Sequence, residues 1–402
     1  MTSSSARPTD FSATDSALGY LYQTRLALWY SLRRLADNDP FSVFIETLDD
    51  VVFENSDETS ELIQLKHHRR AASLTDASPD LWKTLRVWME GRARGLIPDG
   101  NQLFLVTTSE ATEPSAASML LAENRDITQA ADRLSITANT SSNQANAPAY
   151  ELFQTLKAEE RVALLRSVVV VPRSPSIAAV DGPLRQETRT MVRREHLEPF
   201  LSRLEGWWFV RVLRQLIATD TPPILSDELE SMIDDLRDQF KLNSLPVDQD
   251  ILEAGSTVGA EAFADAIFVH QAKLAGVGSQ RVLAAIRDYH RAFEQRSRWV
   301  REELLLVGEL DRYEQHLIEE WQLTFHRMAD EIGDAAADDA KRKAAQRVYT
   351  WVEESGFPIR EGVQHPSLSR GSLHMLAEQM RMGWHPEFVS RLTHLLEQRL
   401  AS

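Results

Sequence analysis

The stretch from Val43 to Arg70 constrains this chain most, because charged residues are embedded there in apolar, β-prone sequence. It predicts two strands, Phe44 to Phe53 and Leu62 to Lys66, joined by a polar hairpin turn from Asn55 to Ser60. Acids and a lysine are costly to bury on a sheet unless they are paired or bind a metal ion. This stretch therefore indicates a functional site.

Alternation along the two strands predicts which side chains meet. Successive side chains of a strand point to opposite faces, so Glu46 and Asp50 are expected on one face of the first strand. Gln64 and Lys66 are expected on one face of the second. Acids, an amide and an ammonium converging at one place suit a divalent cation beside a scissile phosphate. The alternative is that this spacing of residues occurs by chance. The strand register is also assumed, and a slip of one residue would turn Asp50 away from the site and bring Asp49 in.

This pattern resembles the PD-(D/E)XK nuclease superfamily, in the variant with Gln in place of the second acid. The resemblance is carried by Gly19-Tyr20-Leu21-Tyr22-Gln23, Glu46-x-x-Asp49-Asp50-Val51, Gln64-x-Lys66 and Leu81-Trp82-Lys83-Thr84. Over about residues 15 to 110, these motifs are similar to the double-stranded DNA endonuclease domain of bacterial anti-phage systems. That domain occurs in CBASS-associated effectors and in Lamassu-type systems.

The resemblance implies a role for each matching residue. Asp50 would ligate the metal ion, Mg²⁺ or Mn²⁺, with Glu46 as an auxiliary acid. Gln64 would stand in for the second acidic ligand, which lowers the negative charge available to the metal. Lys66 would be the catalytic lysine. Two further auxiliary positions complete the set, Gln23 on the first helix and Asp49.

Composition narrows the class of protein. The chain has 402 residues, of which 43% are apolar and 26% charged, as in a soluble globular protein of two or three domains. It contains no cysteine, which excludes disulfides, zinc-thiolate sites and cysteine nucleophiles. No apolar run reaches the roughly 18 residues of a membrane span, and the first ten residues lack the apolar region of a secretory signal. We therefore expect a cytoplasmic protein without a membrane partner.

Charge distribution bears on DNA binding. The formal net charge of −16 argues against nonspecific coating of DNA. Basic residues nevertheless cluster at Lys66 to Arg70 and at Arg86, Arg92 and Arg94. These residues are expected to flank the site and contact phosphates. The alternative, weighed equally, is that they form an ordinary solvent-exposed surface without a function. An acidic chain with basic residues clustered around its proposed site fits an enzyme that a partner delivers to DNA.

The order of predicted elements indicates an α+β fold. Helix, strand, strand, helix and strand in succession favour a PD-(D/E)XK-like mixed sheet flanked by helices. Helical periodicity then dominates almost to the end of the chain. The predicted domains are a disordered tail at 1–14, the nuclease domain at 15–175, a helical connector at 176–254 and a helical partner-docking domain at 255–402.

Three patterns stand out in the C-terminal half, namely Gln295 to Trp299, Asp311 to Glu314 with Glu320-Trp321, and Ser369 to Ala377 followed by Gly383-Trp384-His385-Pro386. Over about residues 255 to 400 they resemble the C-terminal domain of effectors in bacterial three-component ABC-ATPase defence systems, which are related to Lamassu. The resemblance implies two partners, an SMC-like ABC ATPase and a small middle component.

Chemistry and packing compete as explanations of these C-terminal patterns. His374 and His385, with Glu378, have the side chains to ligate a metal or to act as acid and base. Glycine turns that cap a helix and insert an aromatic ring are the alternative. Core packing and ion pairs are the default, with a partner-docking face as the second interpretation. That face would comprise Arg296, Trp299, Trp321, Arg370, His374, Trp384 and His385.

The function predicted from these features is metal-dependent cleavage of double-stranded DNA, within a bacterial anti-phage or anti-plasmid defence complex. The chain has no P-loop motif, so ATP hydrolysis is expected in the ABC ATPase partner that controls it. The alternative is an adaptor that binds DNA or scaffolds the complex without cutting. Homo-oligomerisation is left open.

Overall fold

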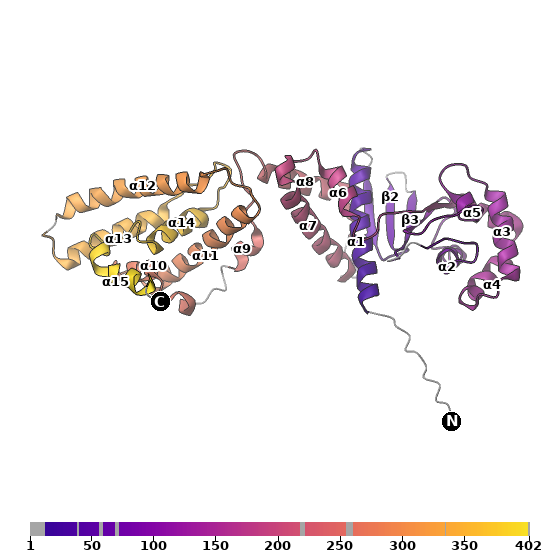
Figure 1. The fold of residues 1–402 in the computed structure, drawn as a ribbon, viewed down its shortest axis with the longest axis horizontal. Helices are drawn as coiled ribbons and strands as arrows, with labels where there is room; N and C mark the ends of the chain where they lie inside the picture. Colours follow the sequence, from indigo (N-terminus) through magenta and orange to yellow (C-terminus); the bar gives the residue numbers. More distant parts are fainter. Residues whose placement is uncertain are drawn as a thin grey trace, which may run out of the picture. The chain divides into compact units, whose positions relative to one another are not determined.

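The computed structural model describes residues 13–37, 40–55, 59–68, 72–217, 222–254, 260–333 and 335–400 (Figure 1). The chain divides into two compact units, Met1–Asp234 and Asp235–Ser402. The first contains a six-stranded mixed sheet with helices, and the described part of the second is helical, which confirms the α+β class. None of the described helices has the length and apolar character of a membrane span. The predicted tail 1–14 lies outside the described residues, except for 13 and 14, which begin the first helix.

The sheet of the first unit has the strand order β5-β4-β3-β2-β1-β6. Neighbouring strands are antiparallel from β3 through β2 and β1 to β6, and parallel from β3 through β4 to β5. The strands are β1 Phe41–Ile45, β2 Val51–Asn55, β3 Ser60–Lys66, β4 Gln102–Thr107, β5 Val168–Val171 and β6 Ile224–Leu225. The predicted hairpin is confirmed, because β2 pairs with β3 from Glu54↔Ser60 to Val51↔Ile63.

The first predicted strand, Phe44 to Phe53, is wrong in one respect: it is two strands joined by a turn. β1 ends at Ile45 and β2 begins at Val51, and the two pair as Ile45↔Val51. Three of the five residues between them are acids, and Asp and Glu are depleted in strands. Glu46 has a φ of 56°, and its N–H donates to the Asp50 carbonyl at 3.0 Å, which closes the turn. Glu46 and Asp50 therefore do not lie on one face of a single strand.

Helices cover both faces of this sheet (Figure 1). On one face, α2 Pro79–Ala93, α3 Ile127–Thr140, α4 Ala147–Thr155 and α5 Ala158–Ser167 share a core with the sheet. The other helices of the unit are α1 Ala13–Leu35, α6 Asp181–Thr188 and α7 Leu197–Ile217. α1 and α7 both pack against β1. α8, Ser226–Gln239, crosses the boundary between the two units.

The first unit extends beyond residue 175, where we expected a domain boundary. α6 and α7 pack against α1 through specific polar contacts. Arg25 of α1 binds Asp181 and, at 2.6 Å, Glu205. The Trp208 indole N–H donates to the Thr24 carbonyl at 2.9 Å. These long-range contacts join much of the predicted connector, 176–254, to the sheet-containing unit.

The second unit is built from α9 Gln249–Ala254, α10 Ile267–Leu274, α11 Ser279–Arg301, α12 Glu309–Ile332, α13 Asp338–Glu354, α14 Pro366–Glu378 and α15 Phe388–Leu400. The helices α10 to α15 contribute to one apolar core. α11 packs along α14. At Gly371 of α14, an added Cβ atom would lie 2.0 Å from the Asp288 carbonyl oxygen and 2.6 Å from the Ala292 Cβ. Gly371 therefore allows the close approach of these two helices.

We expect Gly371→Ala to destabilise the second unit, because the methyl group would collide with the α11 backbone rather than with a movable side chain. The free energy of unfolding should fall by about 2 kcal/mol or more. Gly356→Ala is the matched control, since an added Cβ atom there meets nothing within 4 Å. Thermal unfolding followed by circular dichroism measures both variants, and equal melting temperatures would contradict this interpretation of the helix crossing.

Candidate active site

The end of the sheet where β3 finishes brings most of the predicted site residues together. β2 and β3 are antiparallel, so the start of β2 adjoins the end of β3. The Leu65 N–H donates to Oδ2 of Asp50 at 2.6 Å. Extending the Val51↔Ile63 register by one pair sets Asp50 opposite Gln64. Gln64 and Lys66 are two residues apart on β3 and therefore share one face. Asp50, Gln64 and Lys66 thus lie at the same end of the sheet.

Glu46 belongs to the same group although it lies in the turn. Partial burial raises the pKa of the Glu46 carboxyl, and the nearby negative charge of Asp50 raises it further. A hydrogen bond from the Gln23 side chain and the positive charge of Lys66 oppose this rise in pKa. Gln23 of α1, Asp50 at the end of the turn and Lys66 of β3 therefore all act on one carboxylate.

Asp49 has a different position from its neighbour Asp50. Its carboxylate is buried, accepting from the Trp88 indole N–H at 2.7 Å and from the Asp50 N–H at 3.1 Å. Burial raises the pKa of Asp49 to about 7, more than these two hydrogen bonds lower it. Asp49 thus anchors the turn to α2, whereas Asp50 binds the end of β3.

The raised pKa of Asp49 makes the stability of the first unit depend on pH. An unfolded aspartate titrates near pH 4, whereas folded Asp49 has a pKa of about 7. Between those values Asp49 is protonated in the folded state and ionised in the unfolded state. The free energy of unfolding therefore falls as the pH rises. The contribution of Asp49 should be on the order of 3 kcal/mol between about pH 4 and about pH 8.

Urea unfolding of wild type and Asp49→Asn across this pH range isolates that contribution. The variant should become the more stable protein, relative to wild type, as the pH rises. A difference in unfolding free energy that does not change with pH would contradict the protonation of Asp49.

Lys66 is half-buried and has no carboxylate of a described residue within the 4.0 Å of an ion pair. The electrostatic influence of its charge on Glu46 and Asp49 still shows that it lies near the acidic cluster. Its ammonium group is therefore able to bind an incoming anion without first breaking an ion pair in this part of the chain.

Part of the expected basic rim lies elsewhere. Arg92 donates to the Ser167 hydroxyl at 2.7 Å, just before β5 begins. β3, β4 and β5 are parallel, so this is the opposite end of the sheet from Lys66, and the expectation that Arg92 flanks the site is wrong. Arg94, two residues further, pairs with Glu90 at 3.9 Å. Residues 69 and 70, also expected at the rim, lie outside the described residues.

The site offers oxygen ligands of the kind that Mg²⁺ prefers. After Asp50 Oδ2 accepts from Leu65, the other carboxylate oxygen makes no further described contact, and Glu46 supplies a second carboxylate. Gln64 adds an amide oxygen. Mg²⁺ is usually held by one or two carboxylates together with water. The donor set therefore fits such an ion. A second group, of three acidic or histidine residues whose ligand atoms lie within 4.8 Å of one another, is found elsewhere in the described chain.

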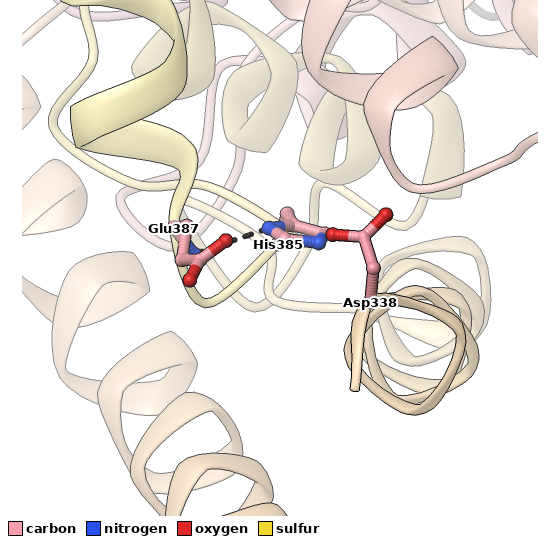
Figure 2. A group of neighbouring side chains, drawn as sticks. All are labelled: Asp338, His385 and Glu387. Carbon is pink, nitrogen blue, oxygen red and sulfur yellow. Dashed lines mark hydrogen bonds between the residues drawn. The ribbon is translucent and has the colours of Figure 1, made fainter. Parts of the chain in front are cut away.

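That second group lies in the C-terminal unit, where Asp338, His385 and Glu387 offer ligand atoms within 4.8 Å of one another (Figure 2). Both carboxylates already bind cationic side chains. Asp338 pairs with Arg391, and Glu387 accepts from Arg391 at 2.6 Å and from Lys341 at 2.7 Å. The Glu387 N–H donates to His385 Nδ1 at 3.1 Å. We therefore assign this group to an ion-pair network between α13 and the start of α15.

The predicted set of His374, His385 and Glu378 does not form a common site among the described residues. His374 packs against the Phe268 and Trp384 rings, with centroid distances of 5.7 and 5.8 Å. Glu378 accepts from the Phe268 N–H at 2.9 Å. Burial lowers the pKa of His374 to about 3, so its imidazole is neutral.

The residues considered for partner docking lie mainly inside the second unit. Trp299 donates to the Pro246 carbonyl at 2.7 Å, and Trp321 donates to the Gly383 carbonyl at 2.8 Å. Arg370 is half-buried and binds Asp288 at 2.6 Å. The other side chains are buried, namely Arg296, Trp299, Trp321, His374, Trp384 and His385. Core packing and ion pairs, the default interpretation, account for these side chains.

The second unit has a recognisable family relationship. Residues 268–392 match the family model for C-terminal domain 7 of the ABC-three component (ABC-3C) systems. This match supports membership of the chain in an ABC-three component system. It also agrees with the resemblance inferred from the three sequence patterns in this half of the chain. No curated protein matches the chain.

Solved structures similar to this chain include the Cap4 SAVED/CARF-domain containing receptor of Acinetobacter baumannii. The receptor with the cyclic trinucleotide 2'3'3'-cAAA has 15% identity and a TM-score of 0.33, over 54% of this chain and 45% of the receptor. This chain therefore spans less than half of that relative. The receptor without a named ligand has 13% identity and a TM-score of 0.34, over 69% and 68%. Similarity at this level carries no argument about function.

Proposed function

We propose that this chain is a metal-dependent double-stranded DNA endonuclease, the effector of a Lamassu-related, SMC-like ABC-ATPase defence system. One observation carries the proposal. Two acids from the β1–β2 turn and an amide and a lysine from β3 meet at one end of the sheet. The PD-(D/E)XK resemblance implied a role for each of them, and their proximity supports those roles.

Asp50 and Glu46 would hold Mg²⁺ or Mn²⁺, with the Gln64 amide beside them. Such an ion, when bound, polarises a phosphate and lowers the pKa of a bound water. Lys66 would bind a non-bridging phosphate oxygen and offset the negative charge that develops during attack. Gln64, which carries no charge, would orient the attacking water.

Asp49 has a positioning role in this proposal. Its hydrogen bonds to the Trp88 indole and the Asp50 N–H fix the turn that presents Glu46 and Asp50. It is buried beneath α2 and would not touch the DNA.

The second unit would dock on the other components, an SMC-like ABC ATPase and a small middle component. The family match of residues 268–392 supports this assignment. The net charge of −16 disfavours strong DNA binding by the chain alone. We therefore expect the ATPase to restrain the nuclease and deliver it to phage or plasmid DNA.

Infection of cells that carry the complete system tests the proposal. Cells with the wild-type chain should resist phage and contain fragmented DNA after infection. Cells with a Lys66→Ala chain at equal abundance should lose both effects. Resistance that persists without DNA fragmentation would overturn the assignment as a nuclease.

A non-cleaving adaptor is the second candidate, and the uncharged Gln64 at a ligand position favours it. In that case the first unit would hold DNA without a metal ion. Calorimetry that detects DNA binding but no binding of Mg²⁺ or Mn²⁺ would support the adaptor over the nuclease.

A further inference from the structure

A cavity of about 300 Å³ lies in the second unit among α11, α13 and α14. Its charged lining consists of Arg281, Arg287, Arg291, Arg370, Asp288 and Glu353. Four arginines against two acids give the cavity a net positive charge within a chain of net charge −16. This contrast in charge indicates a site for an anion.

The acids of the cavity hold two of its arginines in place. Arg281 binds both carboxylate oxygens of Glu353, at 2.9 and 2.5 Å, and Arg370 binds Asp288 at 2.6 Å. Arg287 makes no hydrogen bond or ion pair with a described residue, although its charge acts on Asp288. Its guanidinium group therefore has donors available for a ligand, while the neighbouring arginines are fixed.

Two uncharged side chains of the lining have polar atoms without partners. The Tyr349 hydroxyl and His374 Nδ1 are buried and form no hydrogen bond with a described residue. Buried polar atoms in folded proteins are nearly always hydrogen-bonded. Tyr349 also lies under the Arg281 guanidinium, 5.1 Å from its ring centroid. Both atoms belong to residues of the cavity wall, although each atom is itself shielded from solvent.

We propose that this cavity binds a small phosphate-bearing ligand. Guanidinium groups match the geometry of phosphate oxygens and stay charged at every physiological pH. A volume of about 300 Å³ is at the lower end for small-molecule pockets and suits a small ligand. The site lies within the second unit and does not depend on the nuclease assignment.

Calorimetric titration of the full chain with inorganic pyrophosphate tests this inference. The ionic strength is held constant with sodium chloride, so that general charge screening does not change. Wild type should bind pyrophosphate saturably at a single site. Arg287→Ala should weaken binding by about tenfold or more.

Arg301→Ala is the matched control, because Arg301 is an exposed arginine on α11 that does not line the cavity. It should bind pyrophosphate as wild type does. The inference is overturned if wild type shows no saturable binding. It is also overturned if Arg287→Ala and Arg301→Ala behave alike, because binding would then reflect surface charge alone.

Discussion

Lys66→Ala should lower the rate of DNA cleavage by at least about a hundredfold, the effect of removing one group that stabilises transition-state charge. Lys66 lies beside the acidic cluster and has no ion pair with a described carboxylate. Its loss should therefore remove a contact to the phosphate rather than a contact that holds the fold. Cleavage of supercoiled plasmid in the presence of the partner components measures the rate.

Lys157→Ala is a suitable control, because Lys157 is an exposed lysine just before α5 and is not one of the residues that act on Glu46. It should cut as wild type does. The melting temperature of Lys66→Ala should stay close to that of wild type, since the half-buried Lys66 has no ion pair with a described carboxylate to lose. Cleavage by Lys66→Ala at the wild-type rate would show that the lysine has no part in the reaction.

Asp50→Asn should lower both the affinity for Mn²⁺ and the cleavage rate, each by about a hundredfold. The substitution removes the negative charge but retains an oxygen that can accept from the Leu65 N–H. The sheet should therefore remain intact. Calorimetric titration with Mn²⁺ measures the affinity independently of cleavage.

Asp49→Asn separates this account from the alternative register. The Asp49 carboxylate already accepts hydrogen bonds from the Trp88 indole N–H and the Asp50 N–H. Its substitution should therefore reduce Mn²⁺ affinity much less than Asp50→Asn does. The opposite order of effects would indicate that Asp49, rather than Asp50, is the metal ligand.

Local patterns predict much of the first unit. The polar segment between two β-prone runs predicts the hairpin that pairs Val51 with Ile63, and the β-branched run from Ser167 to Val171 predicts β5. The break at Glu46 was missed, because the flanking residues are apolar enough to read as one strand. A left-handed backbone at a glutamate is uncommon and has no strong sequence signal.

Long-range contacts explain the other differences. α6 and α7 join the first unit through Arg25 and Thr24, which lie more than 150 residues away in the chain. Similarly, the cavity arginines come from two helices, with Arg281 on α11 and Arg370 on α14. Helical periodicity predicts that each helix exists, but it does not predict which helices pack together.

Burial in the second unit was only partly predictable. The unusual Arg-Gly-Ser and Gly-Trp-His-Pro patterns mark this region, and its family match supports that. The residues of these patterns serve packing rather than catalysis. Gly371 allows the close approach of α11, and Trp384 is fully buried. A histidine in such a pattern resembles a ligand in sequence, whereas the structure surrounds His374 with aromatic rings.

Cleavage of supercoiled plasmid by the wild-type chain, assembled with its ATPase and middle component, tests the central claim most directly. Linear or nicked DNA should form with Mg²⁺ or Mn²⁺ and should not form when EDTA removes the metal ion. Intact plasmid under every metal condition, with DNA still bound to the complex, would contradict the nuclease and favour the adaptor.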